Sequence, residues 1–286
     1  MSARTLLNLA LALLAVLLAA IVWLRPGLEP ETAPAAITAL EPEQVSSINI
    51  TRLQGAPLGF SRHDGTWFLD GDPHIPADAF QLRAILALLQ ATSIRSYPAG
   101  ALDLIGLGLD PPQASVMFNG TRVAIGNIEP IDRLRYIKTG TTIHLVEDRY
   151  QHLLNAGFNN FVRRHLLPED ASIIALQLPD LTLTRTDGIH WQLTPEDEMA
   201  GADDIDALVR NWLRASALYV RRFEPGAYDD TISLTMKGEN EPVVFTLISL
   251  EPDLVLARPE WGIQYHLAAD AGAGLLSLPL QPAEQP

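Results

Sequence analysis

The sequence predicts an α+β protein in which an N-terminal transmembrane helix precedes two related units, each an antiparallel sheet with one long amphipathic helix. An apolar run over residues 6–24 predicts the transmembrane helix. Duplication is indicated by Asp64-Gly65 and Asp187-Gly188, which stand between alternating runs typical of strands and are each followed by a tryptophan. A helical stripe follows each pair at one offset, because 187 minus 64 and 205 minus 82 both equal 123.

Residues 6–24 contain one polar residue, Asn8, and about 19 residues suffice to cross a hydrocarbon core of ~30 Å. Trp23 stands where interfacial aromatic residues are found. The alternative is a cleavable signal peptide, but its apolar region is usually about 7–15 residues long. The nearest small-residue pattern, Ala33-Pro34-Ala35, also lies further downstream. We therefore expect an uncleaved anchor.

A short tail, residues 1–5, precedes this anchor and a long C-terminal part follows it, which is the arrangement of a signal anchor. We therefore expect a single-pass protein of the bacterial inner (cytoplasmic) membrane, with its C-terminal domain on the periplasmic or other extracytoplasmic side. Residues 25–44 contain four prolines, which disfavour helix formation and close packing. This segment is predicted to be a semi-extended tether.

The first α+β unit is expected over residues 45–168. A hairpin around Asp64-Gly65 leads to a helix that starts near Pro76 and Asp78. The apolar stripe of that helix is Leu82, Ile85, Leu86 and Leu89. Four alternating runs then predict an antiparallel meander at 114–118, 121–125, 134–138 and 142–146. A short helix near 149–154 and a connecting segment, 158–167, complete the unit.

The second unit is expected over residues 169–278 and repeats this order. Strands are expected at 172–178 and 181–185. The Asp187-Gly188 turn follows them and leads into the next strand. The helical stripe is Ile205, Leu208, Val209 and Trp212, and the later strand-like runs are 231–236, 243–247, 254–258 and 264–267. Residues 279–286 include three prolines and are predicted to form a disordered tail.

Five short motifs of the first unit occur in a characteristic order. They are Gly65-Thr66-Trp67, Pro76-Ala77-Asp78-Ala79, Leu107-Gly108-Leu109-Asp110-Pro111-Pro112, Ile125-Gly126-Asn127 and Arg135-Tyr136-Ile137. With these motifs the chain resembles the DUF4340 family over about residues 45–167, whereas the second unit lacks the Gly-Leu-Asp-Pro-Pro and Ile-Gly-Asn segments. The resemblance implies an uncharacterised, membrane-anchored bacterial envelope protein, similar in some members to auxiliary components of gliding-motility-type ABC transporters. It implies no catalytic residue.

Composition narrows the chemistry that the chain can perform. The net charge is −14, from 20 Lys plus Arg against 34 Asp plus Glu, so nucleic acid is not an expected partner. Cysteine is absent, which excludes a thiolate metal site and a cysteine nucleophile. Gly106 and Gly108 could suggest a phosphate-binding loop, but Pro111-Pro112 stands where the helix of such a loop would begin.

The strongest metal candidate is His63-Asp64 together with Asp70, Asp72 and His74, although such residues are also typical of turns. Two further groups have simpler structural interpretations. An acidic cluster, Glu196-Asp197-Glu198 with Asp203, Asp204 and Asp206, fits the cap of the second helix, and cation binding is its alternative. Trp67 and Trp191 are predicted to pack in the core of each unit, with ligand stacking as the alternative.

Five other histidines are scattered and accompany no nucleophile motif: His144, His152, His165, His190 and His266. We therefore predict no catalytic, cofactor-binding or metal-binding residue and no cofactor. The expected function is that of a membrane-anchored accessory or scaffold subunit that binds protein partners in a membrane complex, such as one associated with a transporter. The alternatives are an envelope hydrolase or metal-dependent enzyme acting on cell-wall or polysaccharide substrates, and a periplasmic ligand-binding module.

Overall fold

The computed structural model describes residues 12–17, 19–20, 35–186 and 190–278. The chain divides into an N-terminal unit, Met1–Ala35, and a compact body, Ala36–Pro286. Residues 12–17 and 19–20 are helical and exposed, but most of the predicted transmembrane helix lies outside the described residues. In the part of the chain that is described, no helix is both long and apolar enough to cross a membrane.

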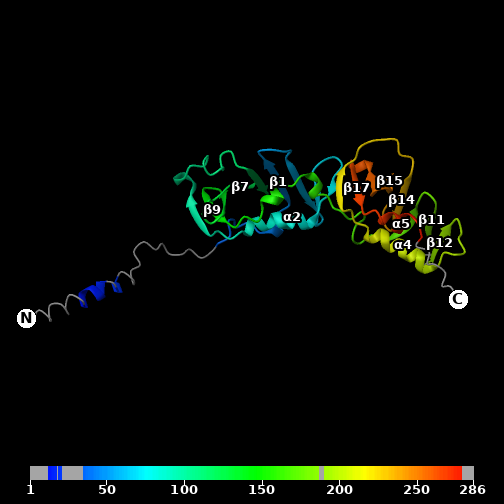
Figure 1. Ribbon diagram of the computed structural model, residues 1–286, viewed down its shortest axis with the longest axis horizontal. Coiled ribbons are helices and arrows are strands. Elements are labelled where there is room, and N and C mark those ends of the chain that lie inside the picture. Colours follow the sequence, from blue (N-terminus) through cyan, green and yellow to red (C-terminus); the bar gives the residue numbers. More distant parts are fainter. Residues whose placement is uncertain (1–11, 18, 21–34, 187–189, 279–286) are drawn as a thin grey trace, which may run out of the picture. The chain divides into compact units, whose positions relative to one another are not determined.

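The body contains two antiparallel sheets and few helices (Figure 1). The first sheet has the order β4-β3-β2-β1-β6-β7-β8-β9-β5. Its strands are β1 (Ser47–Arg52), β2 (Leu58–His63), β3 (Thr66–Leu69), β4 (Ile75–Pro76), β5 (Arg95–Pro98), β6 (Ala114–Phe118), β7 (Thr121–Ile128), β8 (Arg135–Thr139) and β9 (Thr142–Val146). The predicted antiparallel meander is thus confirmed as β6 to β9, which pair in sequence order.

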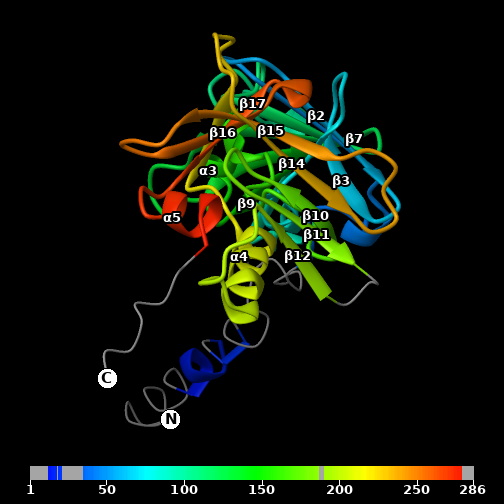
Figure 2. The same ribbon diagram turned by 90° about the vertical axis from the view of Figure 1, so that its right-hand side faces the viewer.

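The second sheet has the order β12-β11-β10-β14-β15-β16-β17-β13 (Figure 2). Its strands are β10 (Ile173–Gln177), β11 (Thr182–Thr186), β12 (His190–Thr194), β13 (Tyr219–Arg222), β14 (Thr231–Met236), β15 (Val243–Ser249), β16 (Leu254–Arg258) and β17 (Ile263–Leu267). This order matches that of the first sheet strand for strand, with one exception: in the described part of the chain, β4 has no counterpart beyond β12.

The helices occupy matching places in the two halves. They are α2 (Ala79–Leu86), α3 (Gln151–Leu154), α4 (Ala202–Arg214) and α5 (Ala271–Leu276), with 3-10 turns η1 (Pro42–Gln44), η2 (Ala87–Gln90), η3 (Ala99–Ala101), η4 (Phe158–Asn160) and η5 (Pro259–Trp261). Asp78 caps α2 by accepting hydrogen bonds from the backbone N–H groups of Phe80 and Gln81, at 2.9 and 3.1 Å. Both predicted stripes are buried, and in α4 Trp212 also donates its indole N–H to the Leu275 carbonyl at 2.8 Å.

One continuous hydrophobic core extends through both halves, from Ile37 to Leu275. The prediction of a tether over residues 25–44 is therefore wrong for residues 36–44. Ile37 is buried, and its N–H donates to the Ala91 carbonyl at 3.0 Å. The side chain of Thr139 donates to the Ile37 carbonyl at 3.0 Å. The proline content of this segment predicted an unpacked tether, but Ile37 within it is buried and attaches the chain to the first half.

The segment between the halves is hydrogen-bonded to both of them. On the first-half side, the Asp78 N–H donates to the Phe161 carbonyl at 2.7 Å and the Arg163 N–H donates to the Pro76 carbonyl at 3.0 Å. On the second-half side, the Leu166 N–H donates to the Ala215 carbonyl at 3.1 Å. The side chains of Phe161 and Leu166 are fully buried. Residues 161–167 therefore join the two halves as part of the core.

The predicted turn at Asp64-Gly65 is confirmed between β2 and β3, where Asp64 and Gly65 have φ values of 49° and 82°. Glycine suits such left-handed backbone because it has no side chain. The second predicted turn, Asp187-Gly188, and the predicted disordered tail at residues 279–286 lie outside the described residues.

Candidate binding surfaces

Two of the motifs meet where the loop before β6 crosses a bulge in β7. The backbone N–H of Asn127 donates to the Leu107 carbonyl at 2.8 Å, and its side-chain amide donates to the Gly106 carbonyl at 3.2 Å. A Cβ atom on Gly126 would lie 2.4 Å from the Leu107 carbonyl oxygen, so only glycine permits this approach. The Gly-Leu-Gly loop is therefore held against the sheet and does not form a phosphate-binding cradle.

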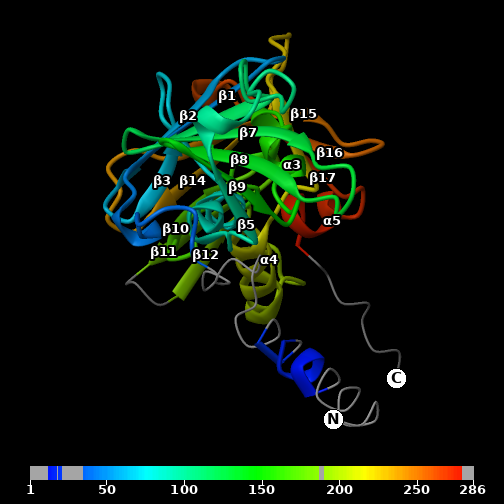
Figure 3. The same ribbon diagram turned by 90° about the vertical axis from the view of Figure 1, so that its left-hand side faces the viewer.

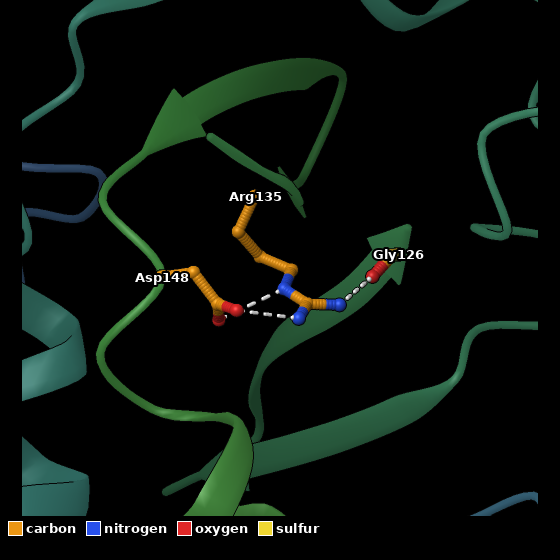
Figure 4. A network of polar contacts seen from close by, with 3 residues as sticks. All are labelled: Gly126, Arg135 and Asp148. Carbon is orange, nitrogen blue, oxygen red and sulfur yellow. Dashed lines mark hydrogen bonds and ion pairs between the residues drawn. The ribbon is translucent and has the colours of Figure 1, made fainter. Parts of the chain in front are cut away.

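A buried arginine reinforces the same bulge (Figure 4). Arg135 in β8 donates from Nε and Nη2 to the carboxylate of Asp148, at 3.0 and 2.7 Å, and from Nη1 to the Gly126 carbonyl at 2.8 Å. Its side chain is only 6% exposed. A bidentate, buried contact of this kind fixes geometry strongly. The Arg135-Tyr136-Ile137 motif thus serves the fold of the first half.

The metal candidate does not assemble. The rings of His63 and His74 are 6.1 Å apart at their centroids, and Phe68 lies near both. Asp70 accepts a hydrogen bond from the Ser61 hydroxyl at 2.8 Å. Across the described parts of the chain, no three His, Cys, Asp or Glu side chains are placed to bind a metal ion.

Two of the scattered histidines lie next to edge strands, His144 in β9, which pairs with β5 (Figure 3), and His266 in β17, which pairs with β13. Their positions in the two sheets are not equivalent. His144 pairs with the core residue Ile137, whereas in β17 it is Tyr265, next to His266, that pairs with a core residue, Leu256. Burial lowers the pKa of both imidazoles. The ring nitrogens of His144 lie 3.0 Å from the Ser93 and Thr139 hydroxyls.

The contact between His144 and Ser93 has only some of the parts of a hydrolase site. The second ring nitrogen meets the Thr139 hydroxyl, whereas a catalytic triad places a carboxylate there. Neither Ser93 nor His144 lines the two grooves described next. His152, His165 and His190 are exposed and far apart in the sequence. We assign these histidines no catalytic role.

The two tryptophans differ in burial despite equivalent positions. Each pairs with an arginine across its hairpin, Trp67 with Arg62 and Trp191 with Arg185, and the guanidinium carbons lie 6.0 and 5.3 Å from the ring centroids. Trp67 is 5% exposed, as a core residue should be. Trp191 is only half-buried and lines a groove.

A groove of about 680 Å³ lies where the two halves join, and we call it the junction groove. Its walls are the tip of the β2–β3 hairpin, the start of α2, the segment 163–170 and Ser216. Phe80, on its wall, is 68% exposed. This volume falls within the range of about 300–1,000 Å³ that is typical of small-molecule sites.

The junction groove has charges of both signs. Arg83, Arg163 and Arg164 line it together with Glu169 and Asp170. The Nε atom of Arg163 is buried and has no hydrogen-bond partner among the residues that the structure describes. Burial lowers the pKa of Arg163, while Tyr265 and the two carboxylates act in the opposite direction. An unsatisfied buried donor of this kind marks a place where an acceptor would be stabilised.

A second groove, of about 480 Å³, runs beside β12, and we call it the β12 groove. It is lined by Trp191 and Leu193 of β12, by Glu196, Asp197 and Glu198, which follow that strand, and by Ile205 of α4. Part of the acidic cluster has the expected capping role, because Asp204 accepts a hydrogen bond from the Gly201 N–H at 3.0 Å. Glu196 and Glu198 instead face this groove.

No curated protein and no solved structure matches the chain. Among protein families, one described as a domain of unknown function (DUF4340) matches residues 67–224. The match begins at Trp67 in β3 and ends just after β13, so it extends into the second half but stops before β14. The motifs had indicated about residues 45–167. Since the match covers more than half of the 286 residues, the chain belongs to the DUF4340 family.

Proposed function

We propose that this protein is a single-pass, membrane-anchored accessory or scaffold subunit that binds protein partners in a bacterial envelope complex and catalyses no reaction. The junction groove is the observation that carries the proposal. Its walls come from both halves, and residues 161–167 hydrogen-bond those halves into one body. A mostly preformed surface with apolar and charged groups is suited to binding a partner at small entropic cost.

Duplication of one α+β unit is part of this proposal. The matching strand orders support it, as do the equivalent pairs Arg62 with Trp67 and Arg185 with Trp191. The second half would then have kept the scaffold and lost the contact between the Gly-Leu-Gly loop and Gly126, which we call the loop lock. A scaffold that presents two versions of one surface can contact two different partners.

Partner binding can be tested by placing a photo-crosslinking amino acid at Phe80, in the junction groove, in the full chain within native membranes. We expect a discrete crosslinked partner that copurifies after gentle solubilisation. Ile131, which is 84% exposed and does not line that groove, is the matched control position. Repeated recovery of the chain alone, with no crosslink from position 80, would contradict the proposal.

The proposed topology has its own test because the sequence contains no cysteine. Glu239→Cys puts a single exposed thiol in the body, between β14 and β15, and Ser2→Cys puts one in the N-terminal tail. In intact cells, a membrane-impermeant maleimide should label the first variant and label the second only after lysis. The reverse pattern would place the body in the cytoplasm.

A ligand-binding module is the second candidate, and the buried Nε of Arg163 favours it. The acceptor that this donor lacks could belong to a small anionic molecule in the junction groove. Titration of the purified chain with carboxylates and phosphates, followed by thermal shift, tests this candidate. An increase in Tm that disappears in Arg163→Met would support it over a purely protein-binding role.

A further inference from the structure

We infer that the outer edge of β12 binds an extended, basic segment of a partner protein, which adds to the second sheet as a further β-strand. This inference rests on the proposed function and names the surface and the chemistry of one partner. Strand addition to an exposed edge is a common mode of peptide recognition, in which backbone hydrogen bonds supply affinity and side-chain pockets supply specificity.

The first half shows what such a strand would do, because there the place is filled. Strand β4 pairs with the outer edge of β3, with Ile75 opposite Leu69 and Pro76 opposite Phe68. The Ala77 N–H then donates to the Trp67 carbonyl at 2.8 Å. Ile75, Pro76 and Ala77 are all buried, and they cover Trp67 and Leu69.

In the second half the corresponding place is open. Strand β12 is the last strand of its sheet, and within the described residues no backbone hydrogen bond reaches its outer edge. Trp191 and Leu193, which correspond to Trp67 and Leu69, are only half-buried. Both side chains line the β12 groove, whereas their counterparts in the first half belong to a strand that is paired with β4. An unpaired edge with half-covered apolar side chains is a template for another strand.

The charges of the β12 groove define the partner. Glu196, Asp197 and Glu198 follow β12 directly and line the groove, and none of them forms an ion pair among the described residues. In a partner segment, Lys or Arg would complement these carboxylates, and a neighbouring small or branched apolar residue would pack on the apolar part of the lining. The tail at residues 279–286 contains Glu284 and no Lys or Arg, so it lacks this complementarity.

A peptide probe tests the inference directly on the full chain in detergent. The probe is a labelled synthetic peptide, Lys-Lys-His-Ile-Pro-Ala-Lys, which copies residues 74–77 of the first half between lysines. We expect saturable binding, and about tenfold weaker binding to the double variant Glu196→Lys with Glu198→Lys, because attraction becomes repulsion. The control is Glu239→Lys with Glu241→Lys, an equal charge change between β14 and β15, which should leave binding unchanged.

Backbone pairing needs a separate measurement, since charge alone could retain a basic peptide. Hydrogen exchange at the amides of Trp191 and Leu193 should slow when the probe is bound. N-methylation of the Ala residue of the probe, the counterpart of Ala77, should abolish binding if its N–H donates as Ala77 does. Unchanged exchange, or full affinity of the methylated probe, would overturn strand addition.

Three further results would overturn the inference in distinguishable ways. Binding of the probe only after removal of residues 279–286 would show that the chain covers its own edge. A dimer that the Glu196→Lys and Glu198→Lys variant dissociates would show that a second copy is the occupant. Failure of the probe to bind, while the crosslink from position 80 persists, would reject this surface and leave the proposed function in place.

Discussion

The two halves of the body share one strand order but end differently at the same edge. In the first half, β4 pairs with β3, residues 161–163 bond to the outer side of residues 76–78, and Trp67 is buried. In the second half, no strand among the described residues pairs with the outer edge of β12, and Trp191 is half-buried. The first half also has the loop lock around Gly126 and Arg135, which the second half lacks in its sequence. The two halves therefore share their strand order. They differ at the β3 and β12 edges and in the loop around Gly126, and these are the places where they could bind different partners.

Of the substitutions proposed here, Arg135→Met should cause the largest loss in the free energy of unfolding. It should make the first half less stable than the second. Removing the arginine leaves the partly buried Asp148 carboxylate without its bidentate partner, which typically costs about 3–5 kcal/mol. Urea unfolding of the full chain measures the change. The control is Arg95→Met, which breaks the ion pair with Asp132, where both side chains are largely exposed and the expected cost is at most about 1 kcal/mol. Equal losses would show that burial does not distinguish the two pairs.

The tryptophan pair gives the most direct comparison of the two edges. Trp67→Ala should destabilise the protein by about 3–5 kcal/mol, as expected when a buried tryptophan is truncated. Trp191→Ala should cost clearly less, because Trp191 is only partly buried and packs at the border of the core. The urea midpoints of unfolding of the two variants, each compared with that of the unmodified protein, measure the two losses. A larger loss at position 191 would mean that the β12 edge is covered in the protein in solution.

Gly126→Ala tests the loop lock with a single added methyl group. The new Cβ would lie 2.4 Å from the Leu107 carbonyl oxygen, so the loop must shift, at a cost of about 1–3 kcal/mol. Gly157→Ala meets no atom within 4 Å and provides the control, which should be neutral or slightly stabilising. Thermal unfolding followed by circular dichroism measures both. Equal Tm values for the two variants would contradict the lock.

Acid should weaken the body slightly through His144 and His266, whose side chains are largely buried. Burial lowers the pKa of His144 and His266 below the ordinary value of 6.5, so the unfolded chain takes up protons first as the pH falls. The contribution of the neutral imidazoles to the free energy of unfolding is thus fully present above pH 6.5 and declines as the pH falls below that value. His144→Gln should flatten the decline between neutral and mildly acidic pH, measured by urea unfolding. A steeper decline in that variant would contradict the assignment.

The sequence was informative where patterns are local. The alternation of β6 to β9 and the stripes of α2 and α4 predicted strands and helices that the structure contains, because one buried face imposes a period on the chain. The same reasoning missed β4, since a two-residue strand has no period and Pro76 argues against pairing. It also missed Ile37, whose single apolar side chain lies in a segment rich in proline.

The candidate surfaces were much harder to predict because they depend on distant segments. The junction groove combines residues near 65, 80, 165 and 216, and no motif joins them in the sequence. The acidic residues at 196–198 were visible as a cluster, but the groove beside them depends on the absence of a strand. The role of Arg135 was likewise hidden, because its partner Asp148 lies on the far side of a hairpin.

The attachment of Ile37 has a mechanical consequence. Any tension carried along the chain from an N-terminal anchor would enter the folded body at this residue. There it would be resisted by the hydrogen bonds to Ala91 and Thr139 and by a buried side chain. Thr139 in turn contacts His144, which links this attachment to β9. The first bonds to yield under load would be those of Ile37 to Ala91 and Thr139, and a pulling experiment from the N-terminus would therefore disturb the first half before the second.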